Sequence, residues 1–486
     1  MRRKITALGV LVAALEVGCG SRSGLLAPDS SPSGGSGGTS LGGTGGSAGT
    51  AGTAGIAGTA GVSGAGGALP DCVLSSAGAP FELLSFPEGD TDTPLFALLD
   101  QGAAGSRLAY AAISQDANFW HPELRVAELS VGPKWPDDAK LTKSPVLYGF
   151  DSHSWGLLAN APEPSSKDFA LAFYHADEAS PNVKPALKFR SFDSSAWQPG
   201  AEIAIDPAGS VVYDFVPGAS VKGKQYADSG YAVAYRGSFD DGDSEPRVAV
   251  LDAKGKTKIG PVPVAAKEKY PGRFSDLSWT GSTYLVATPF GDCPSSPGFC
   301  SAHHVVVRAL DPAGELHVTA EIAPLAPDYL PRRTALASWN GHTHLAWSEG
   351  DAPDDAPRSV RLLALDAAGA ALGAPLTIAE QVRLDHGVSL SVSSEGLLLW
   401  WDHVGEPGPP SEQPGHSLIV LRHFGLAGGE IGPPIEIPAT ALAYGPPLSL
   451  VTLQTPRSAL LSWGGLSTKG GLDVTWLARL DCQAWE

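Results

Sequence analysis

The chain has 486 residues, of which 51 are acidic and 33 are basic, so its formal net charge is -18 and its pI is near 5.0. This balance argues against nucleic acid and anionic lipid head groups as partners, because phosphate binding requires a basic surface. Hydrophobic residues make up 43% of the chain, which is enough for a large folded core.

The first residues have the pattern of an export signal. A basic segment, 2–4, precedes an apolar stretch, 5–17, that is too short to span a bilayer. We predict that residues 1–18 are a signal peptide that is removed. Gly18-Cys19 and the residues before it resemble the lipobox of bacterial lipoproteins, although Glu16 departs from the aliphatic residue of that pattern. The resemblance implies that Cys19 carries a lipid.

The next segment, 19–70, consists mainly of Gly, Ser, Thr and Ala. It has too little apolar surface to offset the entropy of ordering, so we predict a disordered tether. A lipid on Cys19 would then hold the protein in the cell envelope, at the periplasmic or surface side of the outer membrane. Without the lipid, the protein would be secreted.

The remaining segment, 72–486, is longer than a usual single-core domain and contains an internal repeat. Seven short β-prone cores recur at spacings of 53 to 63 residues. The cores are Leu108-Ala109-Tyr110, Leu171-Ala172-Phe173, Val233-Ala234-Tyr235, Val286-Ala287-Thr288, Leu345-Ala346-Trp347, Leu399-Trp400-Trp401 and Leu461-Ser462-Trp463.

Each core has a strand before it and two strands after it. Asn340-Gly341 predicts a two-residue hairpin before one core, and Asp-x-x-Gly turns end the third strand at Asp252, Asp311 and Asp366. Four antiparallel strands in so few residues cannot cover both faces of their sheet, so neighbouring sheets must stack. We therefore predict an all-β fold, a seven-bladed β-propeller with four strands per blade. Tandem sandwiches would need about a hundred residues per unit.

The last repeat lacks its fourth strand, and an unassigned segment, 81–86, precedes the first repeat. We predict that this N-terminal strand completes the last blade by lying beside residues 472–480. The arrangement resembles the shared-blade closure of WD40-type propellers. The resemblance covers topology alone, because the Gly-His and Trp-Asp signatures of that family do not recur here.

The five cysteines agree with an exported protein, since disulfides form in oxidising compartments. Apart from Cys19, we predict two bridges. Cys72 with Cys482 would join the closing strand to the strand beside it, and Cys293 with Cys300 would close a local loop. Four cysteines allow three pairings, and free thiols are the competing interpretation.

The predicted propeller has two unlike faces. Loops between second and third strands are long and polar, whereas the opposite turns are short. By this assignment, eight of the twelve histidines lie in or beside the long loops: His121, His153, His175, His303, His304, His386, His403 and His416. If the protein binds a ligand, we expect it on this long-loop face, although long loops collect polar residues in any case.

The densest acidic cluster on that face contains Asp240, Asp241, Asp243 and Glu245, whose oxygens are candidate Ca²⁺ ligands. The spacing does not match an EF-hand loop, so a solvated acidic loop is the favoured interpretation. A second candidate pair, His342 and His344, alternates on a strand as zinc ligands would, but no third ligand is evident.

No nucleophile elbow, phosphate-binding loop or dinucleotide fingerprint is present. We therefore expect a monomeric, non-enzymatic propeller without a cofactor, calcium excepted, that binds protein or glycan through the long-loop face. The alternative is a carbohydrate-active hydrolase or lyase that uses carboxylates on the same face, because such a pair needs only spatial proximity.

Overall fold

The structure is a computed structural model of the whole chain. It describes residues 73–77, 81–85, 96–100, 106–115, 120–130, 140–143, 148–149, 155–159, 169–175, 186–192, 198–206, 211–221, 230–238, 244–252, 254–264, 269–271, 276–292, 303–351, 357–384, 387–393, 396–404, 417–438, 449–453, 458–466 and 473–483. All of these lie in the unit Gly67–Glu486. The predicted signal peptide, Cys19 and the predicted tether fall outside the described residues.

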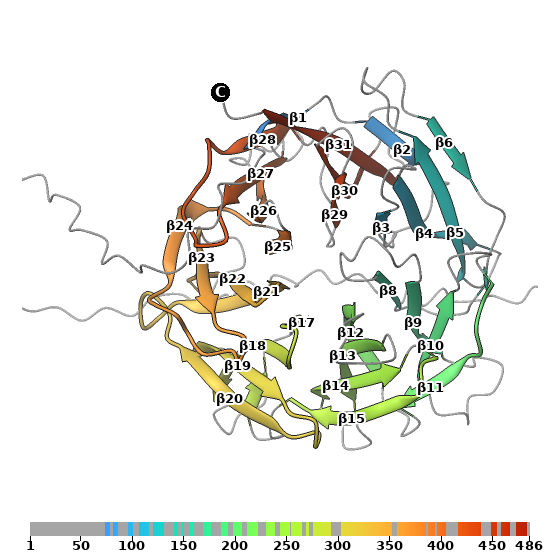
Figure 1. Cartoon of the computed structure of the whole chain (residues 1–486), viewed down its shortest axis with the longest axis horizontal. Helices are drawn as coiled ribbons and strands as arrows, with labels where there is room; N and C mark the ends of the chain where they lie inside the picture. The colour runs from blue at the N-terminus through green and yellow to red at the C-terminus, as the bar shows by residue number, and fades with distance from the viewer. Residues whose placement is uncertain are drawn as a thin grey trace, which may run out of the picture. The chain divides into compact units, whose positions relative to one another are not determined.

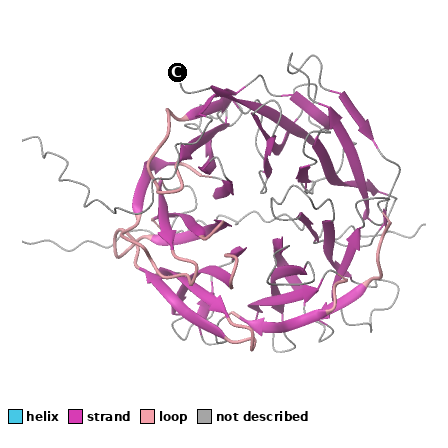
Figure 2. Ribbon diagram, viewed as in Figure 1, coloured by secondary structure: helices cyan, strands magenta, loops and turns pink. Residues whose placement is uncertain are grey.

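The described residues form strands and no helix (Figure 2). In particular, the described part of the chain contains no helix long and apolar enough to cross a membrane. The strands make seven antiparallel sheets, numbered here in chain order (Figure 1).

The first three sheets take up the chain to Pro263. Sheet 1 contains β3 (Phe96–Asp100), β4 (Ser106–Gln115), β5 (Trp120–Ser130), β6 (Lys140–Lys143) and β7 (Tyr148–Gly149). Sheet 2 contains β8 (Trp155–Ala159), β9 (Phe169–His175), β10 (Ala186–Phe192) and β11 (Ile203–Asp206). Sheet 3 contains β12 (Val211–Val221), β13 (Gly230–Ser238), β14 (Ser244–Asp252) and β15 (Thr257–Pro263).

The next three sheets repeat the same order. Sheet 4 contains β16 (Lys269–Pro271), β17 (Asp276–Trp279), β18 (Tyr284–Asp292), β19 (His304–Leu310) and β20 (Leu316–Ile322). Sheet 5 contains β21 (Leu330–Trp339), β22 (His342–Gly350), β23 (Arg358–Leu365) and β24 (Leu376–Val382). Sheet 6 contains β25 (Val388–Ser393), β26 (Gly396–Val404), β27 (Ser417–Phe424) and β28 (Ile435–Pro438).

Sheet 7 joins the two ends of the folded segment. It contains β29 (Ser449–Leu453), β30 (Ser458–Leu466), β31 (Asp473–Gln483) and two N-terminal strands, β1 (Val73–Ala77) and β2 (Phe81–Ser85). Phe81 pairs with Leu477, which confirms the predicted pairing of the 81–86 segment with the last strand. The sequence did not predict β1, which also pairs with β31, because its five residues lack a clear alternation of apolar side chains.

Neighbouring sheets contact one another in chain order. Strands at the first-strand position of successive sheets meet from β3 through β8, β12, β17 and β21 to β25, and β28 of sheet 6 meets β1 of sheet 7. In sheet 4 this position is shared by β16 and β17, which both pair with β18. Sheet 7 then contacts sheet 1 through β29 and β3, so the succession of contacts is closed. This is an all-β, propeller-like arrangement, in which every sheet has a neighbour for each of its faces.

The hydrophobic core lies between sheets. All seven cores predicted from the repeat fall in the strand after the first-strand position of their sheet; in sheet 4 this strand is β18, because β16 and β17 both pair with it on one side. Five of the described clusters of buried side chains each draw on two neighbouring sheets. Phe189 of sheet 2, for example, lies 5.1 Å from the ring of Tyr231 in sheet 3. Trp347 of sheet 5 is fully buried in the same cluster as Leu285 of sheet 4. The recurrent aromatic residues whose side chains are described are therefore packing residues: Phe173, Tyr235, Trp347, Trp401 and Trp463.

The turns that link third and fourth strands follow the predicted Asp-x-x-Gly pattern. The Asp252 carboxylate accepts hydrogen bonds from the backbone N–H groups of Lys254 and Lys256, each at 2.9 Å. Gly255 has φ +84° and touches Phe189 of the preceding sheet. The Asn340-Gly341 hairpin is also confirmed, with positive φ at both residues.

Candidate functional site

In each of the seven sheets, the third strand of the four-strand repeat carries an arginine. In sheets 2, 4 and 6 the arginine lies two residues before the last apolar residue of that strand, which is Phe192, Leu310 or Phe424. In sheets 1, 3 and 5 it lies four residues before that residue, which is Leu129, Leu251 or Leu365. The set consists of Arg125, Arg190, Arg247, Arg308, Arg361, Arg422 and Arg479. Burying an arginine between two packed sheets costs free energy unless a carboxylate pairs with the guanidinium. We therefore compared the partners of these side chains.

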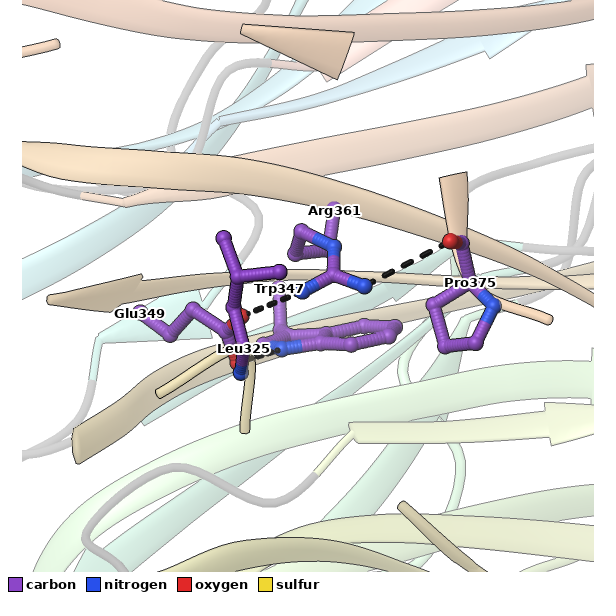
Figure 3. A network of polar contacts seen from close by, with 5 residues as sticks. All are labelled: Leu325, Trp347, Glu349, Arg361 and Pro375. Carbon is purple, nitrogen blue, oxygen red and sulfur yellow. Dashed lines mark hydrogen bonds and ion pairs between the residues drawn. The ribbon is translucent and has the colours of Figure 1, made fainter. Parts of the chain in front are cut away.

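Arg361 of sheet 5 has a carboxylate, an aromatic ring and a backbone carbonyl as partners, although its Nε nitrogen is buried without a hydrogen-bond partner (Figure 3). Its NH1 group donates to Glu349 at 2.5 Å, and Glu349 is fully buried. Glu349 also accepts from the indole N–H of Trp347 and from the backbone N–H of Leu325, both at 2.9 Å. The guanidinium lies 5.7 Å from the Trp347 ring, and its NH2 group donates to the Pro375 carbonyl. The charge is balanced inside the protein.

Arg190 of sheet 2 is balanced in the same way. Its guanidinium lies 4.0 Å from the ring of Tyr148 and 3.6 Å from the carboxylate of Glu202. Glu202 also accepts hydrogen bonds from Lys188 at 2.5 Å and from the Tyr148 hydroxyl at 2.7 Å. Burial raises the pKa of Glu202, but these hydrogen bonds outweigh it and hold the pKa below its ordinary value.

Two further arginines also have carboxylate partners. Arg422 of sheet 6 donates to Glu430 through Nε at 2.6 Å and also through NH2, and its guanidinium lies 5.8 Å from the ring of Phe424. Arg479 of sheet 7 donates to Asp481 at 2.6 Å. In sheets 2, 5, 6 and 7, the third-strand arginine therefore pairs with a carboxylate of the chain.

Arg308 of sheet 4 departs from this rule. Only 7% of the residue is exposed, and its guanidinium lies 5.0 Å from the ring of Phe290. Its NH1 nitrogen is buried without a hydrogen-bond partner, and no ion pair joins Arg308 to any described residue. Desolvation lowers the pKa of Arg308, while the charge of Glu321 opposes that shift without approaching to ion-pair distance.

The side chain of Arg308 lines a groove between sheets 3 and 4, here called the inter-sheet groove. Its volume is about 820 Å³, within the range of small-molecule sites. It lies between β15 on one side and β19 with β20 on the other. The lining residues are Val262, Pro263, Val264, Phe290, His304, Val306, Arg308, Gly314, Glu315, Leu316, His317, Val318 and Glu321.

One end of the inter-sheet groove adjoins the long-loop side of sheet 4. There His304 lies 3.4 Å from the Glu321 carboxylate, an ion pair when the imidazole is protonated, and 5.3 Å from the Phe290 ring. His304 is the first residue of β19 after the long loop. The groove therefore combines a buried cation, two carboxylates, two imidazoles and an aromatic ring with apolar side chains.

The other end of the groove adjoins an exposed group of possible metal ligands, Asp311, Glu315 and His317. Asp311 accepts the backbone N–H of Glu315 at 2.8 Å and approaches the His317 ring nitrogen at 3.1 Å. The backbone hydrogen bond, followed by that of His317, lowers the pKa of Asp311. Asp252 makes the same turn contact in sheet 3, so turn formation accounts for Asp311 without an ion.

Most residues that the sequence singled out are not placed by the structure. Asp240, Asp241 and Asp243 lie outside the described residues, and of Glu245 only the backbone is described, in β14 opposite Gly237. The calcium hypothesis thus stays a prediction.

The two predicted disulfides also remain predictions. Cys72, Cys293 and Cys300 lie outside the described residues. The backbone of Cys482 in β31 pairs in register with that of Leu74 in β1.

The candidate zinc pair is described. His342 is exposed, whereas His344 is 2% exposed and has no partner for either ring nitrogen. The one described group of three possible metal ligands does not include either histidine.

The sequence analysis missed Arg308. The signal that could have revealed it is the arginine that recurs in the third strand of every repeat. The repeat identifies the arginine positions, but it does not identify the one that lacks a carboxylate. That depends on residues from β15, β18 and β20, which only the fold brings together.

No family model matches the chain, and no curated protein matches it. Among solved structures, it is similar to the α-L-arabinanase of Penicillium chrysogenum, with 11% identity, a TM-score of 0.40, and coverage of 84% of this chain and 99% of that one. It is also similar to the Aleuria aurantia lectin AAL, with 13% identity, a TM-score of 0.36, and coverage of 72% and 98%. A third is the NanB sialidase of Streptococcus pneumoniae, with 9% identity, a TM-score of 0.37, and coverage of 82% and 70%. Similarity at this level transfers neither a substrate nor an activity.

Proposed function

We propose that this chain is an exported carbohydrate-binding protein: a seven-bladed propeller, tethered by a lipid on Cys19, that binds its ligand in the inter-sheet groove. The seven sheets, with their closed succession of contacts, support the propeller. The observation that carries the binding site is Arg308, a buried cation on the groove wall with no carboxylate partner among the described residues.

The chemistry of the groove suits a polyhydroxylated ring. A guanidinium offers planar donors for paired hydroxyl groups, and the Glu321 carboxylate is an acceptor on the same wall. The Phe290 ring and the side chains of Val262 and Val306 present apolar surface to the C–H faces of a sugar. This combination of paired polar groups and an aromatic face is typical of small-molecule sites.

The alternative is a hydrolase, and several of the similar solved structures are named as carbohydrate-active hydrolases. Glycoside hydrolysis needs two carboxyl groups about 5 to 9.5 Å apart. The two carboxylates that line the groove, Glu315 and Glu321, lie six residues apart along one outer segment, roughly 20 Å at strand rise. The separation of these two groups favours binding over hydrolysis within the groove. At its end, the carboxylates of Asp311 and Glu315 lie within 4.8 Å of one another, so this pair is the place where the hydrolase alternative is to be tested.

The test is a calorimetric titration of the full chain with a panel of neutral and acidic oligosaccharides. We compare the wild type with Val318→Trp, which adds bulk at the groove from an exposed position on β20. We expect at least one oligosaccharide to bind the wild type and the substitution to weaken that binding tenfold or more. The same mixtures are assayed for new reducing ends.

The matched control is Leu372→Trp, which places the same bulk at an equally exposed position of sheet 5 that does not line the groove. It should bind like the wild type. The proposal fails if no oligosaccharide binds, or if both tryptophan variants bind equally well. Release of reducing ends by the wild type would establish the hydrolase alternative instead.

A further inference from the structure

We infer that the inter-sheet groove takes a carboxylate-bearing sugar, such as a uronic acid unit, and that the ligand supplies the carboxylate that Arg308 lacks. This inference rests on the proposed carbohydrate function and names the class of ligand. It follows from a comparison within the chain, between the third-strand arginine of sheet 4 and those of sheets 2, 5 and 6.

Arg308 differs from three other third-strand arginines in one group, a carboxylate partner. Arg190, Arg361 and Arg422 each lie over an aromatic ring and within ion-pair distance of a glutamate. Arg308 keeps the aromatic ring, Phe290, and its burial. Only the carboxylate is missing, and the groove lies against this side chain.

The carboxylates of the chain near this place are already engaged elsewhere. Glu321 lies beside His304 at 3.4 Å, and its side chain is 63% exposed. Asp311 accepts the turn N–H of Glu315 at the far end of the groove. Neither forms an ion pair with Arg308, so an anion from outside the chain would find the guanidinium available.

A carboxylate is the anion that fits best. Guanidinium groups bind carboxylates through two parallel hydrogen bonds, and such pairs are strengthened away from water. A larger polyanion is less suitable, because Glu315 and Glu321 flank the groove and would repel repeated charges near the walls. A single acidic group on a sugar ring places one charge at Arg308 and leaves the ring for Phe290 and the valines.

The experiment uses the full chain and short oligosaccharides that carry a single galacturonic acid unit, with their methyl esters as matched neutral ligands. Esterification removes the charge and leaves the sugar skeleton. We expect the acid to bind at least tenfold more tightly than the ester. This comparison needs no variant, so it does not depend on the folding of a substituted protein.

Two variants then assign the preference to a residue. Arg308→Met keeps the stem and removes the charge, and we expect it to bind acid and ester equally weakly. Arg190→Met makes the same change of net charge at an arginine that already has Glu202, and we expect it to keep the tenfold preference. Circular dichroism and melting curves verify that both variants fold.

The outcomes separate the two proposals. If neutral oligosaccharides bind the wild type and the acid has no advantage over its ester, the carboxylate inference is wrong and the carbohydrate function stands. Retention of the preference by a folded Arg308→Met variant also overturns the inference. If neither acids, esters nor the neutral panel bind, the proposed function itself is wrong.

Discussion

Two titratable side chains in sheets 4 and 5 have pKa values that move in opposite directions. Burial lowers the pKa of His344 to about 4, with a smaller effect from the nearby His342. Burial raises the pKa of Asp276 to about 6, although its carboxylate accepts the backbone N–H groups of Leu336 at 2.6 Å and Leu277 at 2.8 Å. The bond to Leu336 joins sheet 4 to sheet 5.

These shifts predict opposite contributions to the pH dependence of stability. The unfolded chain binds a proton at His344 below its ordinary pKa of 6.5 while the folded chain resists it, so this term lowers stability as pH falls from 6.5 to 4. The folded chain keeps a proton on Asp276 that the unfolded chain loses above 3.8, so this term lowers stability as pH rises from 4 to 6. Each amounts to about 3 kcal/mol at its limit.

Single substitutions separate the two terms. His344→Leu should raise the free energy of unfolding at pH 4 relative to wild type, because an unpaired buried imidazole is replaced by an apolar side chain. Asp276→Asn should abolish the loss of stability between pH 4 and 6. Urea denaturation at several pH values measures both effects. Parallel pH profiles for wild type and both variants would refute the assignment.

Among the structural elements, the Asp-x-x-Gly turns do more than reverse the chain. A Cβ atom on Gly255 would lie 2.3 Å from Phe189 of the preceding sheet, in addition to requiring a positive φ. Gly428 ends a similar turn in sheet 6 with φ +87°, but nothing lies within 4 Å of its Cβ position. The first glycine thus makes an inter-sheet contact that the second does not.

We predict that Gly255→Ala destabilises the protein by about 2 to 4 kcal/mol, because the backbone strain is joined by a clash in a packed core. Gly428→Ala should cost about 1 kcal/mol, the backbone term alone. Chemical denaturation of the two variants gives the comparison. In a Phe189→Ala background the extra cost at Gly255 should disappear, and equal costs in both backgrounds would contradict the inter-sheet contact.

The sequence predicted the elements of the fold well where local patterns repeat. The seven second-strand cores, the Asn340-Gly341 hairpin and the Asp-x-x-Gly turns are local signals, and the structure confirms them. It could not predict the isolation of Arg308, because its possible partners come from other strands and from a neighbouring sheet. The acidic cluster at Asp240 was predicted as a candidate site because its residues are close together in the sequence. The groove residues are dispersed from Val262 to Glu321, so no local pattern identifies them.

At the scale of the whole molecule, stability depends on sheet 7, where β1 and β2 pair with the C-terminal strand β31. Without them, β31 would be an unpaired edge, and its neighbours would lose a covering strand. We predict that deletion of residues 20–86 lowers the melting temperature by more than 10 °C and promotes aggregation. Thermal melts with light scattering measure both.

The matched deletion, 20–66, removes most of the predicted tether and leaves β1 and β2 in place. It should melt like the undeleted chain, since the strands of sheet 7 are retained. Similar melting curves for the two deletions would show that the N-terminal strands contribute little to the fold.

The pairing in sheet 7 also determines when the N-terminal strands can pair during synthesis. β1 and β2 are the first strands to be made, and their partner β31 is the last. The intervening sheets can form as the chain emerges, but β1 and β2 can pair only after β31 has been made. Because this pairing joins residues that are far apart in the sequence, we expect it to be a slow step of folding. A chain cut short anywhere before β31 would leave β1 and β2 without the strand that they pair with.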